Sequence, residues 1–413
     1  MNRFAFGFVV LACAMLVIMP AVASDYTLGI FGNANIDDTI DELDIEYVRG
    51  IIAGTNEATE LADANYDGKI DEEDIAQIEL IIQGDEKELT MRDSVDRVVT
   101  VNMPINRVIA FNKEQVETMR SIKSKDKIVG VGKYVIEDEF LAEFVDYPNV
   151  GSMADPNYET LLKLDPEIVF LYATFYATQC EAIQDKLNDL DPDIKIIRID
   201  LFKPESYTDE TNKLGYLLGR TEESTEFIQF YESWMNSISE KLNEIPQEER
   251  PSVYFENRKS YYCAGNGSGH QQKIELAGGN NIFSDREGYF DVDPEAVVER
   301  NPEVIIRTEA NVNGYSTHDE NELRNVKEDI VSRPELADVI AVKNDDVYVI
   351  NNQIEGGVKH FIGIGYMAKW LHPDIFEDLN PQAIHQEYLT RFQGLDYDLD
   401  EHGVFVYPPL EVS

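Results

Sequence analysis

Cysteine is scarce in this chain of 413 residues, which holds three in total. One of them, Cys13, lies near the start, so Cys180 and Cys263 are left for the rest of the chain. Two cysteines are too few for a disulfide framework. A bridge between them would pin together two halves that we predict to be separate lobes, so we expect free thiols. No group of His and Cys residues has the spacing of a zinc site.

Basic residues are also few: 35 Lys and Arg stand against 79 Asp and Glu, which gives a formal net charge of −44. This charge excludes nucleic acid as a partner, because the phosphates would be repelled. A salt-rich habitat and an ordinary acidic extracellular surface would both explain it. Hydrophobic residues make up 43% of the chain, enough for the cores of two or three domains.

Long apolar runs are confined to the start of the chain. Residues 1–23 combine Arg3, an apolar run up to Ile18 and the small-residue pattern Ala21-Val-Ala before Ser24, which is typical of a signal peptide. We therefore predict a secreted or cell-surface protein, outside the cytoplasmic membrane. Two alternatives stay open. Cys13 ends a lipobox-like stretch that would be lipidated, and roughly 20 mostly apolar residues would suffice as a retained anchor.

Two acidic stretches of twelve residues follow. The second places oxygen side chains at positions 1, 3, 5, 9 and 12, with Gly68 at position 6 for a sharp turn, which is the pattern of a calcium loop. Its candidate ligands are Asp63, Asn65, Asp67, Lys69 through its carbonyl, Asp71 and Asp74. The first loop offers Asn33, Asn35, Asp37, Thr39, Asp41 and Asp44, with Asp38 where Gly is usual. We predict two calcium sites, the second stronger; a solvated acidic turn is the alternative.

Each loop ends in Asp rather than Glu and leads into an apolar helix, predicted at residues 45–52 and 75–82. The stretch from Gly32 to Gly84 resembles the dockerin module, and we place this domain at residues 28–84. The resemblance implies a small all-α domain that folds around two calcium ions and docks on a cohesin-like partner.

One long helix is predicted from Thr221 to Ile245, within a linking segment at residues 221–246. Thr221 would cap its first turn and Pro246 would end it. At ~1.5 Å rise per residue it would be on the order of 36 Å long, enough to join two small domains. Its apolar positions follow the spacing of one helix face: Phe227, Phe230, Tyr231, Trp234, Met235, Ile238, Leu242 and Ile245.

A similar unit occurs on either side of that helix. Residues 157–171 and 293–306 each read as a capped short helix, a turn closed by Pro, and a buried strand. Glu159 and Glu295 stand seven residues before the Pro in their copies. The repetition predicts two α/β lobes, at residues 89–220 and 251–413, that face each other across a ligand cleft.

Apolar runs alternate with helical patterns in both lobes, as in a parallel sheet. Strands are predicted at residues 107–111, 128–131, 168–172, 195–199, 252–255, 304–307 and 347–350. Helices are predicted at residues 113–121, 158–164, 177–190, 272–277, 294–300 and 358–371.

A family resemblance is carried by the order and spacing of several short motifs. They are residues 107–111 (RVIAF), 128–132 (IVGVG), 150–152 (VGS) and 275–282 (ELAGGNNI). Together with the single linking helix they resemble the solute-binding proteins of iron-siderophore, haem and cobalamin importers, from Leu89 to Leu379. The resemblance implies two Rossmann-like lobes joined by one long helix. It also implies a receptor, not an enzyme, that captures a metal chelate and delivers it to an ABC permease.

In this family one Glu on each lobe surface pairs with permease arginines, and the resemblance carries that docking role to Glu159 and Glu295. The alternative is that each Glu only stabilises the first turn of its helix through the helix dipole.

Ligands in open α/β sheets lie beyond the carboxyl ends of the strands. A ferric chelate with acidic oxygens would suit Arg for paired hydrogen bonds and Tyr for stacking or ligation. The candidates are therefore Tyr134, Tyr172, Tyr176, Arg258, Tyr261, Tyr262, Arg307 and His360. His318 is a further candidate for cobalt or haem iron, and Gly265 to Gly269 reads as a flexible cleft loop.

Other functions stay open at this stage. Cobalamin or haem would be bound by the same class of receptor, and metal chelatases use similar two-lobed folds. A third alternative is a cell-surface interaction protein that acts through the dockerin-like module. No Ser-His-Asp, paired-carboxylate or nucleotide motif stands out, which disfavours an enzyme. The sequence does not fix the chelate.

Overall fold

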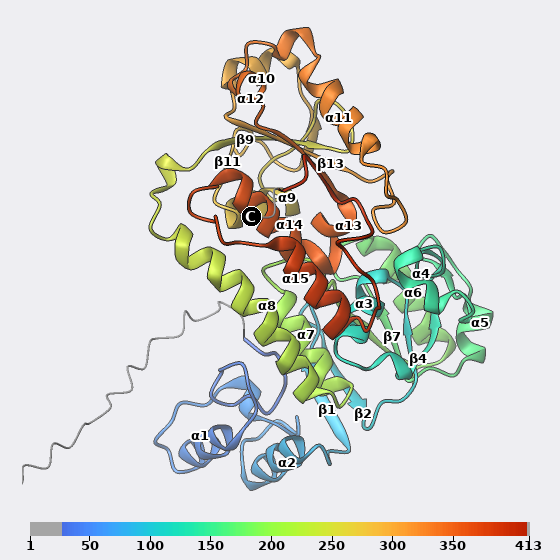
Figure 1. Ribbon diagram of the computed structural model, residues 1–413. Helices are drawn as coiled ribbons and strands as arrows, with labels where there is room; N and C mark the ends of the chain where they lie inside the picture. Colours follow the sequence, from blue (N-terminus) through green and yellow to red (C-terminus); the bar gives the residue numbers. More distant parts are fainter. Residues whose placement is uncertain (1–26, 411–413) are drawn as a thin grey trace, which may run out of the picture.

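The computed structural model describes residues 27–410, and the predicted signal peptide lies outside them. Two α/β lobes are joined by one long helix, with a small helical unit at the lower end of the first lobe (Figure 1). No helix within residues 27–410 is long and apolar enough to cross a membrane.

The first lobe is built on a parallel sheet of order β4-β3-β7-β8. Its strands are β3 (Val108–Ala110), β4 (Ile128–Val131), β7 (Ile168–Leu171) and β8 (Lys195–Arg198). Strand β7 is buried at every position, which is why it reads as an unbroken apolar run. The main helices are α3 (Lys113–Ser121), α5 (Tyr158–Lys163), α6 (Ala177–Leu190) and α7 (Tyr207–Leu217). The predicted strands and helices are confirmed here within one or two residues, and α7 was not predicted.

The second lobe has a mixed sheet of order β12-β10-β9-β13-β14-β15, with β11 paired to β9. Strands β9 (Ser252–Asn257), β13 (Val304–Glu309) and β14 (Val347–Asn351) are parallel, as the alternation predicted. The antiparallel strands β10 (Tyr262–Ala264), β12 (Tyr289–Asp291) and β15 (Val406–Tyr407) were not predicted, because runs of two or three residues carry no periodic signal. The main helices are α9 (Gly269–Leu276), α10 (Pro294–Arg300), α11 (Asn321–Val331) and α14 (His360–Leu371).

The shorter elements connect these layers. They are β1 (Glu88–Arg92), β2 (Val98–Asn102), α4 (Lys133–Ile136), β5 (Gly151–Ser152), β6 (Asp155–Pro156), β11 (Asn280–Asn281), α12 (Ile340–Asn344), α13 (Asn352–Glu355) and α15 (Pro381–Glu387).

The linking helix α8 spans Thr221–Leu242. The prediction that Thr221 caps it is wrong, because the helix starts at Thr221 and Arg220 holds the cap position without a side-chain hydrogen bond. Most of the predicted stripe is buried, including Phe227, Tyr231 and Ile238. The indole Nε1 of Trp234 donates to the Phe361 carbonyl on α14 at 3.1 Å, so a buried polar group is satisfied where the two helices meet.

The segment after α14 ties the lobes together a second time. The Tyr388 hydroxyl donates to Glu117 of α3 in the first lobe at 2.7 Å, and Glu117 also pairs with Lys359 at the start of α14. The chain then returns to the second lobe, where β15 pairs antiparallel with β14. The angle between the lobes is therefore held by α8 and by this C-terminal segment.

The N-terminal unit contains α1 (Glu42–Ile52) and α2 (Glu72–Gln83). Asp41 and Asp71 cap these helices, each in a capping box closed by the Asp three residues later. The unit is fastened to α7 of the first lobe: the Ile40 amide donates to the Tyr216 hydroxyl at 2.9 Å, and the Asn212 side chain donates to the Asp38 carbonyl at 2.8 Å.

Cys180 and Cys263 are buried free thiols in different lobes, as predicted. Burial raises the pKa of Cys180, and it raises the pKa of Cys263 to about 12, so both thiols stay protonated at neutral pH.

Candidate ligand-binding cleft

A cleft of about 720 Å³ lies between the lobes. It begins where strands end: Tyr172 follows β7, Arg258 follows β9 and Asn352 follows β14. This is the position expected for a ligand in an open α/β sheet. The lining residues are Glu114, Tyr172, Thr174, Phe175, Phe202, Lys203, Pro204, Glu205, Arg258, Asn266 to Lys273, Glu275, Tyr289, Asn352 and Glu355 to Gly357.

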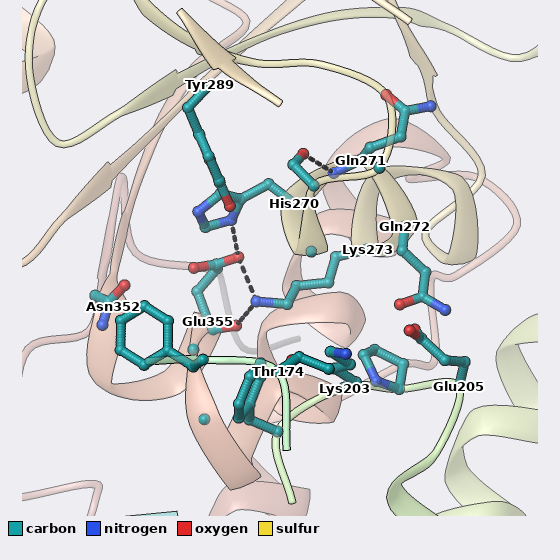
Figure 2. Close-up of a pocket in the computed structure, with 18 of the residues that line it drawn as sticks. Thr174, Lys203, Glu205, His270, Gln271, Gln272, Lys273, Tyr289, Asn352 and Glu355 are labelled. Atoms are coloured by element: carbon teal, nitrogen blue, oxygen red, sulfur yellow. Dashed lines mark hydrogen bonds and ion pairs between the residues drawn. The ribbon is translucent and has the colours of Figure 1, made fainter. Parts of the chain in front are cut away.

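Three charged or titratable side chains meet in the wall of the second lobe (Figure 2). The Nδ1 atom of His270 lies 2.6 Å from Oε1 of Glu355, and the Lys273 ammonium donates to the same oxygen at 2.9 Å. Lys273 also donates to the Glu355 carbonyl at 2.7 Å. His270 and Lys273 lie three residues apart on α9, so one helix face delivers both to Glu355 at the end of α13.

Burial and charged neighbours together set the protonation states of His270 and Glu355. Burial lowers the pKa of His270, against the opposing effect of Glu355, so the imidazole is neutral at pH 7. Burial alone would raise the pKa of Glu355, but His270 and Lys273 hold it below its ordinary value, so this carboxylate is ionised. A neutral imidazole beside a carboxylate carries its proton on Nδ1 and leaves a lone pair on Nε2.

Among the described residues, the hydrogen bond that His270 makes through its ring is the one from Nδ1 to Glu355, which leaves Nε2 without a partner there. The ring stacks on Phe255, with centroids 4.6 Å apart, and Tyr289 meets it edge-on at 5.7 Å. Burial raises the pKa of Tyr289 to about 12, so its phenol is protonated without a metal. An imidazole held by a carboxylate is the usual arrangement of a metal ligand, so His270 and Tyr289 are the residues that could reach a metal carried into the cleft.

Two of the predicted ligand residues line the cleft. The Arg258 Nη2 atom donates to the Asn352 side chain at 2.9 Å, and the rest of the guanidinium is exposed. The Tyr172 hydroxyl donates to Glu114 at 2.5 Å. Burial and the Glu114 carboxylate raise the pKa of Tyr172 well above its ordinary value, so this residue offers the cleft an aromatic edge rather than a phenolate.

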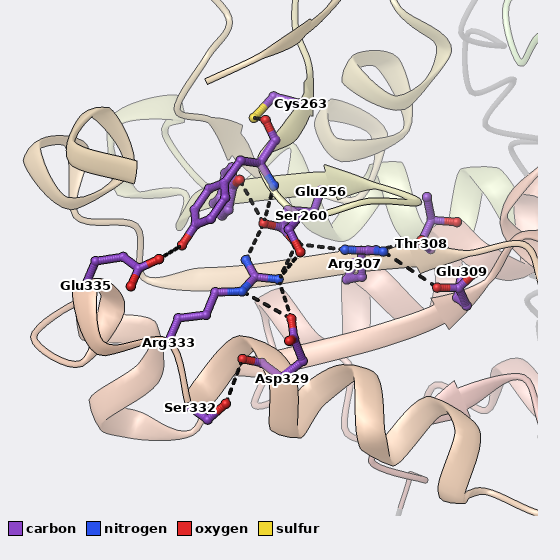
Figure 3. A network of polar contacts seen from close by, with 12 residues as sticks. Glu256, Ser260, Cys263, Arg307, Thr308, Glu309, Asp329, Ser332, Arg333 and Glu335 are labelled. Carbon is purple, nitrogen blue, oxygen red and sulfur yellow. Dashed lines mark hydrogen bonds and ion pairs between the residues drawn. The ribbon is translucent and has the colours of Figure 1, made fainter. Parts of the chain in front are cut away.

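Arg307 and Tyr261 belong instead to an ion network inside the second lobe (Figure 3). Arg307 and Arg333 both pair with the fully buried Glu256, at 3.0 and 2.6 Å. The Tyr261 hydroxyl donates to Glu335 at 2.5 Å, away from the cleft. Neither residue lines the cleft, in contrast to the prediction: Arg307 pairs with the buried Glu256, which requires cationic partners, and the Tyr261 hydroxyl is taken up by Glu335.

The remaining candidates do not line the cleft either. His360 is fully buried, with Nε2 2.9 Å from the Tyr231 hydroxyl and Nδ1 2.9 Å from the Gly357 carbonyl. Burial lowers the pKa of His360 to about 3, and both nitrogens are already used. Tyr134 is exposed on α4, Tyr176 packs on Phe175, and Tyr262 stacks on Tyr289. The last two therefore contact aromatic residues that line the cleft without lining it themselves.

The residues missed by the sequence analysis are His270, Lys273, Tyr289 and Glu355. The interpretation of residues 265–269 as a cleft loop is supported, since Gly267, Ser268 and Gly269 line the cleft. His270 directly follows this loop, and that adjacency was the available signal. Its partner Glu355 is 85 residues away in sequence, so no local pattern connects them.

Glu159 and Glu295 lie exposed in the first turns of α5 and α10, at the outer parts of the two lobes (Figure 1). The predicted caps are confirmed: Asn157 accepts from the Thr160 amide at 3.1 Å, and Asp293 accepts from the Glu295 amide at 2.9 Å. The two carboxylates therefore occupy matching places in the repeated unit.

The two acidic loops bring together oxygen side chains, and the second makes the sharp turn that its sequence predicts. In the second loop the Asp63 carboxylate accepts from the Asp67 and Gly68 amides, both at 3.0 Å, and Gly68 has φ +88°. Asp44 and Asp74 are buried, and burial raises the pKa of both, that of Asp44 to about 6. Within residues 27–410 no three His, Cys, Asp or Glu side chains are already gathered around one metal position. An ion would therefore have to draw these carboxylates together.

We predict that His270 is neutral at pH 7 with its proton on Nδ1, because Glu355 accepts that proton and burial disfavours the imidazolium. Long-range proton–nitrogen NMR correlations of the full chain check this directly. Glu355→Gln should change the His270 signals, whereas Glu205→Gln at the rim should leave them in place. An imidazolium signal for His270 at pH 7 would contradict the assignment.

A family model described as periplasmic binding protein matches residues 108–354, more than half of the chain. The ABC transporter substrate-binding lipoprotein YvrC of Bacillus subtilis is 21% identical over 295 residues, covering 70% of this chain and 87% of that protein. The molybdate-binding protein MolA of Haemophilus influenzae is 22% identical over 342 residues, with coverage of 75% and 92%.

A solved structure with a similar fold agrees with this family match. The structure of the TroA-like periplasmic binding protein FepB from Veillonella parvula matches with a TM-score of 0.66 at 21% identity, covering 77% of this chain and 98% of that one. These relatives are named as a substrate-binding lipoprotein of an ABC transporter, a molybdate-binding protein and a periplasmic binding protein. The chain belongs to the periplasmic binding protein family.

Proposed function

We propose that this protein captures a ferric chelate outside the cytoplasmic membrane and delivers it to an ABC permease. The observation that carries the proposal is the neutral imidazole of His270, held by Glu355 at 2.6 Å, with its Nε2 lone pair unused in the wall of the cleft. Imidazole is a suitable ligand for iron. Tyr289 beside it supplies a phenol that an iron(III) centre would deprotonate.

The size and wall of the cleft favour an iron ion that arrives with its own organic ligands. A volume of about 720 Å³ is typical of a site for a whole small molecule. Aromatic rings of the first lobe also line the cleft: Tyr172 meets Phe175 at 5.5 Å and Phe202 at 5.7 Å between centroids. Such rings pack against the body of a chelate, while His270 faces its metal.

The lobes are held in a fixed relation, which suits a preformed cleft. Lys359 pairs with Glu117 between the lobes, and the Asn313 side chain donates to Glu139 at 2.6 Å. With α8 and the C-terminal segment these contacts limit lobe movement, so little conformational free energy is lost when a ligand binds.

The permease partner would be recognised through Glu159 and Glu295. Their matching, exposed positions suit two basic sockets on two permease subunits, and the helix-dipole role of each Glu is compatible with docking.

For the N-terminal unit we propose calcium binding in both loops, stronger in the second. The residues that would hold the ion there are Asp63, Asn65, Asp67, the Lys69 carbonyl, Asp71 and Asp74, and Gly68 allows the turn. Burial raises the pKa of Asp74 and the neighbouring Asp63 carboxylate raises it further, and a calcium ion would oppose both effects. The cohesin-like partner and the membrane anchor stay predictions.

His270→Ala and Arg258→Ala should weaken binding of a ferric chelate. A lost charge-assisted contact costs ~1.5 to 3 kcal/mol, so Arg258→Ala should reduce affinity roughly ten- to a hundredfold. Fluorescence-quenching titration with ferric chelates measures this, with His318→Ala, an exposed histidine outside the cleft lining, as the control. Unchanged affinity in both cleft variants would show that the chelate binds elsewhere.

The double variant Glu159→Gln/Glu295→Gln should bind chelate normally and associate poorly with the permease, with a larger loss at low salt because the lost contacts are ionic. Uptake by cells and association with the permease in detergent measure this. Glu181→Gln/Glu299→Gln removes two exposed charges from other helix positions and is the matched control. Normal transport by the first variant would leave only the helix-dipole role.

Millimolar calcium should slow amide hydrogen exchange across residues 33–83 of the full chain, and Asp67→Asn or Asp74→Asn should abolish the effect in the second loop.

Without calcium, the raised pKa of Asp44 makes the stability of the N-terminal unit depend on pH. Its stabilising contribution is complete below its unfolded pKa of about 4 and is lost as pH rises through about 6. Protection corrected for intrinsic exchange should therefore fall over this range with chelator and stay level with calcium. Equal protection with chelator and with calcium at neutral pH would refute calcium binding.

A further inference from the structure

The first acidic loop, residues 33–44, lies against helix α7 of the first lobe, whereas the second loop, residues 63–74, does not. Resting on the calcium binding proposed above, we infer that Asn212 and Tyr216 of α7 are positioning residues for calcium in the first loop. A calcium ion bound there would fasten the N-terminal unit to the first lobe, and the second loop would bind calcium independently of the lobe.

The two loops are alike in their internal hydrogen bonds. The amide of Asn35, at position 3 of the first loop, donates to Asp44 at position 12 at 3.1 Å. In the second loop the amide of Asn65 donates to Asp74 at 3.2 Å. Because the two loops tie the same positions together, the second loop serves as an internal reference for the first.

The loops differ at position 1. Asp63 of the second loop accepts two amide protons of its own turn, both at 3.0 Å. Asn33 holds this position in the first loop, and its side-chain nitrogen instead donates to two backbone carbonyls, at 2.9 and 2.5 Å. Position 6 of the first loop is Asp38, where the second loop has Gly68. The first loop therefore lacks the carboxylate that holds the turn of the second.

Helix α7 holds the turn of the first loop from outside. The Asn212 side chain donates to the carbonyl of Asp38 at position 6, at 2.8 Å. The Tyr216 hydroxyl accepts from the amide of Ile40 at position 8, at 2.9 Å. Asn212 and Tyr216 stand four residues apart on α7, so one face of a single helix reaches both points of the turn.

The second loop has no equivalent contact. Within residues 27–410, the Gly68 carbonyl and the Ile70 amide, at its positions 6 and 8, make no hydrogen bond. Burial differs in the same way: Ile40 is 6% exposed, whereas Ile70 is half-buried and Gly68 is exposed. The lobe thus contacts one of two similar loops, and it contacts the loop that lacks a carboxylate at position 1.

The first loop also contains a buried acceptor that a cation would satisfy. Asn33 is fully buried, and its Oδ1 atom has no hydrogen-bond partner among the described residues. The side-chain nitrogen already has two acceptors, so the oxygen is the atom left over. Position 1 supplies the first ligand of a calcium loop, and amide oxygens are suitable calcium ligands. The residue that weakens the internal hydrogen bonding of the loop therefore still fits the ion.

Calcium binding and the contact to α7 depend on the same backbone. An ion requires its ligands at fixed positions around it, which also fixes the carbonyl of Asp38 and the amide of Ile40 between them. If α7 favours this conformation of the loop, the ion favours the contact to α7 to the same extent, because such coupling is reciprocal. The Phe31 amide also donates to the Thr90 carbonyl of β1 at 3.0 Å, so the unit has a second attachment that does not involve the loop.

The first test is a calcium titration of the full chain, read by amide hydrogen exchange and mass spectrometry, which gives a separate midpoint for each loop. Asn212→Ala/Tyr216→Phe should raise the midpoint of the first loop at least fivefold, because two hydrogen bonds to the loop are lost. The midpoint of the second loop should not move. Asn188→Ala/Tyr134→Phe makes the same two substitutions at exposed positions of α6 and α4 and is the matched control.

The outcomes separate this inference from calcium binding itself. Calcium binding in both loops with no change in the first midpoint, or with equal shifts in both loops, would overturn the role of α7 and leave the calcium sites standing. Calcium binding in the second loop alone would also overturn it. Absence of calcium-dependent protection in both loops of the unsubstituted chain would overturn the calcium sites as well.

The second test leaves α7 unchanged and starts from the calcium ligands. Calcium should slow amide exchange in α7 of the unsubstituted chain, because the ion strengthens the contact to that helix. Asp37→Asn in the first loop should abolish this protection of α7. Asp67→Asn, the same substitution at position 5 of the second loop, should preserve it. Protection of α7 that survives Asp37→Asn, or that both variants abolish equally, would overturn the inference.

Discussion

The packing of α8 against α14 is the contact on which the rest of the molecule depends. Phe227, Phe230, Tyr231 and Trp234 face the second lobe and the C-terminal segment, and the Trp234 indole bonds to α14. Burial of several large aromatic side chains contributes a few kcal/mol each. Because this contact sets the distance and angle between the lobes, it also sets the width of the cleft. The C-terminal segment fixes the same geometry from a second side, because it contacts α3 of the first lobe through Tyr388 and then pairs with the second lobe as β15.

Burial distinguishes structural polar groups from those available to a ligand. His360 and His270 are both buried and neutral, yet both ring nitrogens of His360 already have partners in the protein. His270 has one partner, Glu355, and Glu355 in turn keeps one oxygen without a donor. Since buried polar groups are normally satisfied, the proposed function would have a ligand complete this pair. In the ion network around Glu256, by contrast, Arg307 and Arg333 pair with the two carboxylate oxygens inside the second lobe.

The N-terminal unit is integrated with the receptor rather than tethered to it. Its first loop bonds to α7 through the Ile40 amide and the Asp38 carbonyl, so ordering of that loop acts on the first lobe. The second loop makes its hydrogen bonds within the unit itself. The two copies of one motif therefore have different surroundings, which their similar sequences do not reveal.

The sequence alone determined the local elements and their order. Helices α3, α6 and α10 and strand β4 were predicted at their observed bounds, because periodicity and capping are encoded within a few residues. It also placed Tyr172 and Arg258 near the carboxyl ends of predicted strands, and both line the cleft. Tertiary structure alone decided the rest. Arg307 follows the same rule as Arg258 but is drawn inward by Glu256, 51 residues away, and His270 is made available by Glu355, 85 residues away. Whether a polar side chain faces its own core or the cleft depends on partners that only the folded chain brings into contact.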